Sequence, residues 1–482
     1  NVSSANAALT ITSGTAATAT TTLSPAVSAS GTTVAITTPT LSLGAGASVN
    51  ATTGGMDINS NAATGDLAVV LANGSALNAN AGGQTIRFNN LSANAITINA
   101  NPGEGTISAT GGFINFNGGA EAVNVDVNNL VGCVGGTGNP FNIAVDSGDL
   151  SLGGITSPAN LVFTAAAGGN ITFCANCTST GGSVTATTDA NRSISLNPAV
   201  VVRGQTGVSF TTGTVNNNGT VRANTNNVAL TAGTINNNAS GVIEALAGNV
   251  AIQSNAAGNA LVVNMGAASA INAAAAGGDI TFNNTTAGSI TINNAGIGTI
   301  NANDTVVLNG GANAVSVNVN DISGCVTGSG TTFAVNVDTG NLTIGNVSTT
   351  GLTSFTDTDF TLGLGTISQC AGCTIGSTGS IALTAGFNGS VNVNGAGISS
   401  TGGSVTLTAG SNDGDVIVSA GAPVSGSGAV SLLGGTRGSI TVGAAVSSTG
   451  STLTLTSGPA GGESVTIENG ATATGNTSVA VT

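Results

Sequence analysis

Short runs of alternating apolar and polar residues occur along this chain and are separated by clusters of Gly, Asn and Ser. In SVNVN (390–394) and TLTLT (452–456), Val or Leu occupies every second position. A period of two places the apolar side chains on one face of a β-strand, and the turn-forming clusters limit each strand to roughly four to six residues. The sequence therefore predicts an all-β protein built from many short strands.

A short repeat organises these strands. The segment 213–232 is followed at once by the similar segment 233–252, so that the Asn run 216–218 returns as 236–238. A unit of this size, with two or three short strands, cannot bury a core alone and becomes stable only when successive units stack. We expect residues 1–482 to form one continuous parallel β-solenoid with about 20–22 residues per coil, each coil hydrogen-bonding to the next.

A longer repeat supports the same architecture. Residues 118–133 match 310–325 at an offset of 192, and 56–70 match 250–263 at an offset near 194. Upstream, 23–31 match 196–204 at an offset of only 173, so the second copy has gained about one coil. A stack of equivalent coils tolerates such an insertion easily.

These offsets define the expected organisation of the chain. Two super-repeats cover about 1–187 and 188–380, and short C-terminal repeats of roughly 22–26 residues cover 379–482. At ~20 residues per coil and ~4.8 Å between stacked strands, the whole chain would make about 24 coils and a rod about 115 Å long.

Composition and charge narrow the function classes. Gly accounts for 75 of the 482 residues, charged residues make up 5 %, and the net charge of −14 includes five cations, all of them Arg. No basic patch suited to nucleic acid or anionic lipid occurs, and no apolar stretch of about 18 residues could span a membrane. The chain begins at Asn1 without Met or a signal region, which we interpret as a processed or excised segment of a longer protein.

The repeat units resemble a known family. GSIALTAG (379–386), GSVTLTAG (403–410), GSITVGAAVSSTG (438–450) and GTINNNASG (233–241) look like the repeats of filamentous haemagglutinin-type proteins. The resemblance covers nearly the whole chain and implies a right-handed parallel β-helix in a surface or secreted bacterial adhesin. The family's N-terminal secretion domain and a binding module are not recognisable here, so the resemblance implies a shaft.

The cysteines are candidates for disulfides. Three occur in each super-repeat: Cys133, Cys174 and Cys177, then Cys325, Cys370 and Cys373. The two CxxC motifs suggest a metal site, but they lie about ten coils apart, roughly 48 Å, and the chain has no His. We therefore expect structural disulfides in an exported protein, and no metal.

The disulfide connectivity stays open at this point. Cys133 lies about two coils from the first CxxC, or ~9.6 Å, which exceeds the Cα–Cα reach of a disulfide. Cys133 can bond there only if the turn GGTGNP (135–140) makes the coil between them irregular. Otherwise Cys174 and Cys177 pair with each other and Cys133 is left over. An odd thiol in each repeat could link neighbouring rods.

Carboxylate pairs are the remaining candidates for chemistry. The pairs are Asp146 with Asp149, Asp357 with Asp359, and Asp413 with Asp415. We interpret them as turn residues, because a catalytic carboxyl needs charged or apolar neighbours and the chain lacks Lys, His, Tyr and Trp. SNDGD (411–415) has the oxygen density of a Ca²⁺ loop, so Asp413 and Asp415 are a weak calcium candidate. We expect no enzyme activity and no other cofactor.

Three functions compete. The first is a structural extracellular rod, fibre, sheath or surface filament that binds copies of itself head-to-tail and possibly side by side, since the strand-like tail NTSVAVT (476–482) presents an open edge. The second is an adhesin stalk or binding module that contacts glycan or another surface through Thr or Asn ladders, for example from 18–22, 216–218, 236–238 and 452–456. The third, a carbohydrate-active enzyme, would need a carboxylate cleft.

Overall fold

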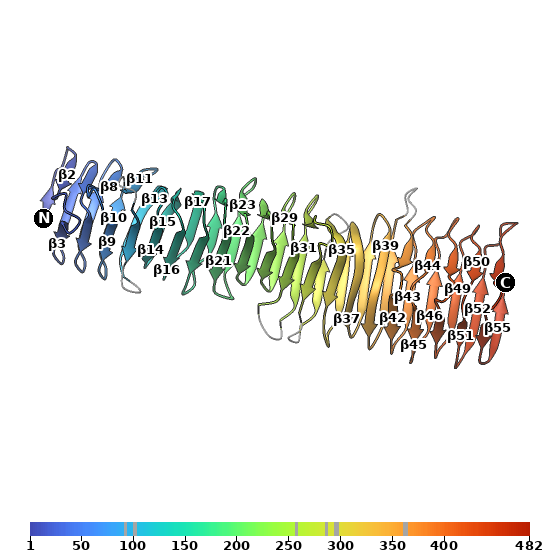
Figure 1. Cartoon of the computed structure of the whole chain (residues 1–482). Helices are drawn as coiled ribbons and strands as arrows, with labels where there is room; N and C mark the ends of the chain where they lie inside the picture. Colours follow the sequence, from blue (N-terminus) through green and yellow to red (C-terminus); the bar gives the residue numbers. More distant parts are fainter. Residues whose placement is uncertain (91–93, 100–103, 256–258, 285–287, 294–297, 360–364) are drawn as a thin grey trace. The chain divides into compact units, whose positions relative to one another are not determined.

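A computed structural model describes residues 1–90, 94–99, 104–255, 259–284, 288–293, 298–359 and 365–482. In these ranges the regular elements are all β-strands and their pairings are parallel, which confirms the predicted all-β solenoid (Figure 1). No helix in them is long and apolar enough to cross a membrane. The contacts divide the chain into unit 1 (1–232) and unit 2 (233–482), and each is described by itself.

Strands of successive coils in unit 1 pair in three parallel ladders. Ladder A contains β1 (Val2–Ser3), β4 (Ser28–Gly31), β7 (Ser48–Ala51), β10 (Ala76–Ala79) and the first halves of β13 (Thr106–Asn117) and β15 (Asn129–Thr137). Ladder B contains β2 (Leu9–Thr12), β5 (Val34–Thr37), β8 (Met56–Ser60), β11 (Thr85–Asn90), the second halves of β13 and β15, and β17 (Leu150–Ser157). Ladder C contains β3 (Thr20–Leu23), β6 (Thr40–Leu43), β9 (Leu67–Leu71), β12 (Ile96–Asn99), β14 (Val123–Val127), β16 (Phe141–Val145), β18 (Leu161–Ala165), β21 (Ser183–Thr188), β24 (Gly207–Thr211) and β27 (Val228–Thr231).

After β17, one strand again becomes two. The first half of β17 pairs with β19 (Ile171–Phe173), which continues through β22 (Ser193–Leu196) to β25 (Thr214–Asn217). Its second half pairs with β20 (Cys177–Ser179), which continues through β23 (Val201–Gly204) to β26 (Thr220–Ala223).

Unit 2 repeats this plan with its own strands. Ladder D contains β28 (Thr234–Asn237), β31 (Leu261–Met265), β34 (Ile290–Asn293), β36 (Val315–Val319), β38 (Phe333–Val337), β40 (Thr353–Asp357), β43 (Ile381–Thr384), β46 (Val405–Thr408), β49 (Val430–Leu433), β52 (Thr452–Thr456) and β55 (Ser478–Val481). Two further ladders, β29 (Val242–Ala245) to β32 (Ala270–Ala273) and β30 (Val250–Gln253) to β33 (Ile280–Asn283), join in β35 (Thr299–Asn309), β37 (Asp321–Gly330) and β39 (Leu342–Thr349).

The joined strand of unit 2 separates after β39. One branch contains β41 (Ile367–Gln369), β44 (Val391–Val393), β47 (Val416–Val418), β50 (Ile440–Val442) and β53 (Val465–Ile467). The other contains β42 (Thr374–Ser377), β45 (Gly397–Ser400), β48 (Val424–Gly426), β51 (Val446–Ser448) and β54 (Ala473–Gly475).

The core of each unit is a stack of apolar layers. In most strands every second residue is buried, and the parallel register places it against the same kind of residue in the next coil, as with Ile36 above Ile58 and Leu407 above Leu432. Phe rings are among the largest buried side chains, and Phe88 and Phe116 stack with their centroids 4.9 Å apart. The period-two pattern of the sequence is therefore the pattern of this core.

The coils are less uniform than predicted. Paired residues in consecutive coils are as few as 18 positions apart, as for Val123 and Phe141, and as many as 30, as for Ala76 and Thr106. The estimate of 20–22 residues per coil thus holds for some coils only, because turns of very different length leave the strands in register. Among the described residues, ladder C has ten strands and ladder D eleven, fewer than the 24 coils expected. The repeated segments 213–232 and 233–252 each form three strands, β25 to β27 and β28 to β30.

The longest strands mark equivalent places in the two units. In β13, β15 and β17, and again in β35, β37 and β39, two ladder positions share one continuous strand. The register slips by one residue between β15 and β17, next to Gly135, and between β37 and β39, next to Thr327. All six cysteines lie in or directly after these irregular coils.

Candidate functional site

The first disulfide joins Cys133 in β15 to Cys174, which follows β19. Cys133 pairs with Ser151 of β17, and Ser151 pairs with Thr172 of β19, so the bond spans two coils. The Cα–Cα distance is nevertheless only 6.9 Å, because Cys174 leaves the ladder and its N–H donates to the Leu152 carbonyl at 2.7 Å. Of the two alternatives left open by the sequence, the structure contains the bond from Cys133.

A glycine in the coil between the two cysteines makes room for this bond. A Cβ atom on Gly153 would lie 2.9 Å from the Cys174 Sγ and 2.6 Å from the Ala175 backbone nitrogen. In unit 2, a Cβ atom on Gly345 would lie 2.9 Å from the Cys325 Sγ. Gly153 and Gly345 are 192 residues apart, which is the offset of the super-repeat, but nothing in their local sequence distinguishes them from the other glycines.

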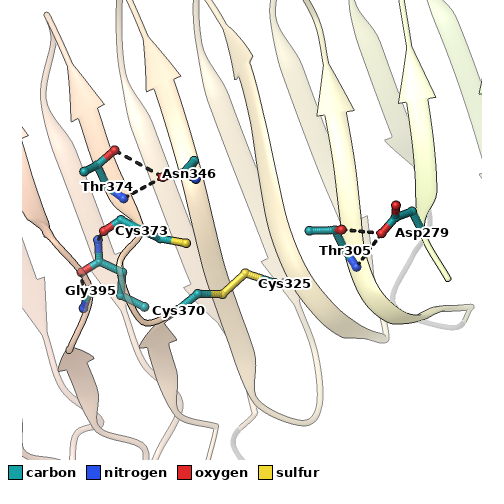
Figure 2. The surroundings of a disulfide bond; sticks show 9 residues. Asp279, Thr305, Cys325, Asn346, Cys370, Cys373, Thr374 and Gly395 are labelled. Atoms are coloured by element: carbon teal, nitrogen blue, oxygen red, sulfur yellow. Dashed lines mark hydrogen bonds between the residues drawn. A yellow bond between two sulfur atoms is a disulfide. The ribbon is translucent and has the colours of Figure 1, made fainter. Parts of the chain in front are cut away.

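The second disulfide joins Cys325 in β37 to Cys370, directly after β41, with a Cα–Cα distance of 6.8 Å (Figure 2). The Cys370 N–H donates to the Ile344 carbonyl at 2.7 Å, as Cys174 does to Leu152 in unit 1. The two long-strand regions therefore carry the same type of two-coil disulfide.

The third cysteine of each repeat differs between the units. Cys177 is the first residue of β20, where it pairs with Ile155 and is fully buried, and burial raises the pKa of its thiol to about 12. In unit 2, Val347 corresponds to Ile155, and its partner in the next coil is Ile375 instead of a cysteine. Cys373 lies two residues before Ile375, in a turn, and is half-buried. A thiol in the core is unreactive, whereas a thiol at the surface can react.

Three sulfur atoms converge in unit 2. The Sγ atoms of Cys325, Cys370 and Cys373 all lie within 4.8 Å of one another, a spacing that could suit a thiophilic metal ion. Two of them are joined in the disulfide, so the oxidised cluster offers one free thiol as a ligand. This cluster combines a disulfide with a neighbouring thiol, an arrangement that permits sulfur exchange.

The pair Asp357 and Asp359 is buried at the end of β40, rather than exposed in a turn. Asp357 Oδ1 accepts a hydrogen bond of 2.9 Å from the Asp359 N–H, whereas its buried Oδ2 has no hydrogen-bond partner among the described residues. Burial, and then the carboxylates of Asp359, Asp321 and Asp338, raise the pKa of Asp357 to about 6, which the Asp359 N–H offsets in part.

This carboxylate cluster is specific to unit 2. The residues 192 positions before Asp321, Asp357 and Asp359 are Asn129, Ala165 and Ala167. Burial also raises the pKa of Asp321, and the Thr358 hydroxyl donates to the Asp338 carboxylate at 2.8 Å. Comparing the two super-repeats by sequence could have revealed the cluster, because an Ala-to-Asp exchange at an inward position is unusual.

In the other two carboxylate pairs, Asp149, Asp413 and Asp415 interact with neighbouring coils. Asp149 is exposed, and its Oδ1 accepts hydrogen bonds of 2.9 and 3.0 Å from the backbone and side-chain nitrogens of Asn170. Asp415 accepts the Ser439 N–H at 2.7 Å, and Asp413 lies 3.9 Å from the Arg437 guanidinium. The calcium candidates therefore each face a nitrogen donor from the next coil.

An open groove of about 370 Å³ lies on the outward side of ladder C. Its polar lining comes from Thr97, Asn124, Asp126, Asn142 and Thr164. Burial, and then the charge of Asp146, raise the pKa of Asp126. The groove thus has one perturbed carboxyl group and several amide and hydroxyl groups.

Asn ladders run along the outward faces. Asn59, Asn89 and Asn117 form one over three coils, with Nδ2–Oδ1 distances of 2.8 and 2.6 Å. Of the predicted ladder runs, Asn236 bonds to Asn264 at 2.8 Å, and Asn216 donates to the Ser195 hydroxyl at 3.2 Å. The middle residues of both runs, Asn217 and Asn237, instead point inward: Asn217 accepts the Gly219 N–H and Asn237 donates to the Ala270 carbonyl.

Outward Thr residues stack in single columns. Two continuous columns among the described residues are Thr164, Thr187, Thr211 and Thr231 in unit 1, and Thr356, Thr384 and Thr408 in unit 2. In the second column Leu433 takes the next position. Neither column has a second Thr column beside it on the same strands. The neighbouring outward positions include Val162 and Ala229 in the first and Ser354 and Ala382 in the second.

Comparisons of the chain with protein-family models, with curated proteins and with solved structures found no match.

Proposed function

We propose that this protein is a structural component of an extracellular or cell-surface fibre, in which the solenoid serves as a stiff shaft. The observation that carries the proposal is the stacking within each unit: among the described residues, each coil pairs in parallel with its neighbours, and identical side chains bond along the axis in Asn ladders. Two-coil disulfides fasten the irregular coils. Such cross-linking is typical of proteins in oxidising compartments.

The resemblance to filamentous haemagglutinin-type repeats supports a bacterial surface location. The charged fraction of 5 % and the absence of Lys leave trypsin only five sites, all of them Arg. A closely hydrogen-bonded stack also shields the backbone from proteases. These properties suit a durable shaft outside the cell.

We further propose that copies associate end to end. In β53 and β55, positions that alternate with the strand period stay exposed: Ile467 is 46 %, Val479 44 % and Val481 54 % accessible. Both strands pair on one side, with β50 and β52, and an outer strand edge that carries exposed Val and Ile can template pairing with another strand. A second copy that stacks on these strands would bury them as the preceding coils bury theirs.

The experiment is negative-stain electron microscopy of the non-reduced protein over a micromolar concentration series. If copies associate end to end, we expect filaments much longer than one chain, and their length should increase with protein concentration. Isolated particles at every concentration would contradict self-assembly and would favour a stalk. A parallel series with reductant tests whether thiols link the copies.

A matched pair of variants separates end-to-end from side-by-side association. Val479→Asp alters the exposed strand β55, whereas Val70→Asp alters a valine of similar accessibility, 43 % against 44 %, on the outward side of ladder C. End-to-end stacking predicts that only Val479→Asp shortens the filaments. Shortening by Val70→Asp alone would indicate lateral contacts instead.

A second candidate function, ligand binding, is favoured by the groove on ladder C. Its amide, hydroxyl and carboxyl groups suit a polar ligand such as a glycan. A screen of the purified protein against glycans would test this function. Asn142→Ala, a substitution in the lining of the groove, is expected to weaken any binding found.

A further inference from the structure

The cysteine cluster of unit 2 contains both partners of a sulfur-exchange reaction. Cys373 is a free, half-buried thiol, and its Sγ lies within 4.8 Å of both sulfurs of the Cys325–Cys370 disulfide. Figure 2 shows the Cys373 sulfur on the side of its turn that faces this disulfide. Attack by a thiolate on a disulfide needs this proximity and solvent access.

The backbone permits the product of such an attack. Residues 370–373 form a β-turn in which the Cys373 N–H donates to the Cys370 carbonyl at 3.2 Å. Gly372 has a φ of +75°, which suits the third position of a type II turn. The first and last Cα atoms of a β-turn lie within about 7 Å, which is also the reach of a disulfide. A Cys370–Cys373 bond therefore fits this turn.

Buried hydrogen bonds hold the turn in place. Gln369, only 2 % accessible, donates through Nε2 to the Cys373 carbonyl at 2.7 Å and to the Gly397 carbonyl at 2.9 Å. The Ala396 N–H donates to the same Cys373 carbonyl at 2.6 Å. The next coil thus fixes Cys373 beside the disulfide. In unit 1 the residue equivalent to Gln369, at the end of β19, is the apolar Phe173, which cannot donate these hydrogen bonds.

We propose that Cys325, Cys370 and Cys373 form a thiol–disulfide exchange site. The deprotonated Cys373 sulfur attacks the Cys370 Sγ, the Cys370–Cys373 bond forms, and the Cys325–Cys370 bond breaks. Cys325 leaves as a thiolate and takes up the proton that Cys373 released to solvent. No oxidant or reductant is consumed, and the bond moves from a link across two coils to a link within one turn, which leaves Cys325 as the reactive thiol.

Unit 1 provides an internal control for this inference. It has the same two-coil disulfide and the same CxxC spacing, but Cys177 is fully buried and its thiol is disfavoured as a thiolate. Exchange should occur in unit 2 and not in unit 1, although the motifs CANC and CAGC differ at one position only.

The test is alkylation of the folded, non-reduced full-length chain. Limiting N-ethylmaleimide is added at pH 8 for increasing times, the reaction is stopped with acid, and the protein is unfolded, digested with pepsin without reduction and mapped by mass spectrometry. We expect one maleimide in unit 2, divided between Cys373 and Cys325, with Cys325 labelling accompanied by a Cys370–Cys373 disulfide. Cys177 should stay unlabelled.

Two variants complete the experiment. Cys373→Ser should lower the labelling of Cys325 about tenfold or more, because no attacking thiol remains, and Cys177→Ser should leave the pattern unchanged. Circular dichroism checks that both variants keep the β fold. Labelling of Cys373 alone at all times, with the Cys325–Cys370 bond intact, would overturn the proposal, as would Cys325 labelling that persists in Cys373→Ser.

Discussion

Gly153 lies directly against the sulfur of Cys174: a Cβ atom on this glycine would be 2.9 Å from the Cys174 Sγ. The relationship explains how a disulfide can bridge two coils that would ordinarily be ~9.6 Å apart. At position 153 the intervening coil presents no side chain, and Cys174 leaves its ladder toward this position. In unit 2 the equivalent Gly345 lies against the other cysteine of its disulfide, since a Cβ atom there would be 2.9 Å from the Cys325 Sγ.

Gly153→Ala should therefore destabilise unit 1. The added methyl group would also meet the Ala175 nitrogen at 2.6 Å, and a backbone atom cannot move aside cheaply. We expect a loss of about 1–3 kcal/mol, typical of overpacking, and slower formation of the Cys133–Cys174 bond on refolding. Urea unfolding and a free-thiol assay measure the two effects. The control is Gly82→Ala, where a Cβ atom has no neighbour within 4 Å; equal effects of both substitutions would argue against the explanation.

Asp357→Ala should stabilise unit 2 at neutral pH. The pKa of Asp357 is raised in the fold from an ordinary value of 3.8 to about 6, so the fold favours the protonated carboxyl group. The free energy of unfolding should fall as the pH rises from about 4 to about 6 and then level off. Removing the carboxyl group should restore about 1–2 kcal/mol above pH 6.5, less than the full pKa difference because solvent screens the charge.

Unfolding of wild type and Asp357→Ala in urea at pH 4 and at pH 7.5 checks this prediction. The substitution introduces the residue that unit 1 carries at the equivalent buried position, Ala165. Asp149→Ala, at an exposed carboxylate, is the control. A stabilisation of equal size at both pH values would show that ionisation of Asp357 is not its cause.

The Phe layers make a size-specific prediction at Phe116. Its ring lies between Phe88, at a centroid distance of 4.9 Å, and Phe141, at 6.3 Å. Phe116→Ala should cost about 3–5 kcal/mol, because it leaves a cavity between two coils. Phe116→Leu should cost less than about 1.5 kcal/mol, since the equivalent residue of unit 2 is the buried Leu308. Thermal unfolding monitored by circular dichroism measures both losses. An equal loss of stability in Phe116→Ala and Phe116→Leu would contradict the prediction.

The Asn ladder predicts a dependence on position. Asn89 bonds to Asn59 and to Asn117, whereas Asn117 bonds only to Asn89 within this ladder. Asn89→Ala should cost about 1–2 kcal/mol and Asn117→Ala about half as much, since each hydrogen bond contributes roughly 0.5–1.5 kcal/mol. Urea midpoints of the two variants and of the double variant measure the coupling. Additive effects would mean that the side chains do not act as a ladder.

Much of the fold could be predicted because its determinants are local. The alternation in SVNVN and TLTLT specifies which side chains point inward, and the structure buries Val391, Val393, Leu453 and Leu455 accordingly. The repeated run 216–218 and 236–238 indicated coils that stack in parallel. Coil length was harder to predict, because a turn can grow by ten residues while the strands on either side keep their register.

The sites depended on contacts between distant residues. The spacing of the cysteines left two connectivities open, and a glycine about 20 residues from either cysteine decides between them. CANC and CAGC are nearly the same motif, yet Cys177 enters the core while Cys373 stays in a turn. The reason is that the strand after the second motif begins to pair at Ile375, two residues later. The sequence alone thus determined the repeating strand and its inward face, through local alternation. Only the tertiary structure decided which thiol is buried, which carboxyl group loses its water and which sulfurs meet, because these depend on the register between coils.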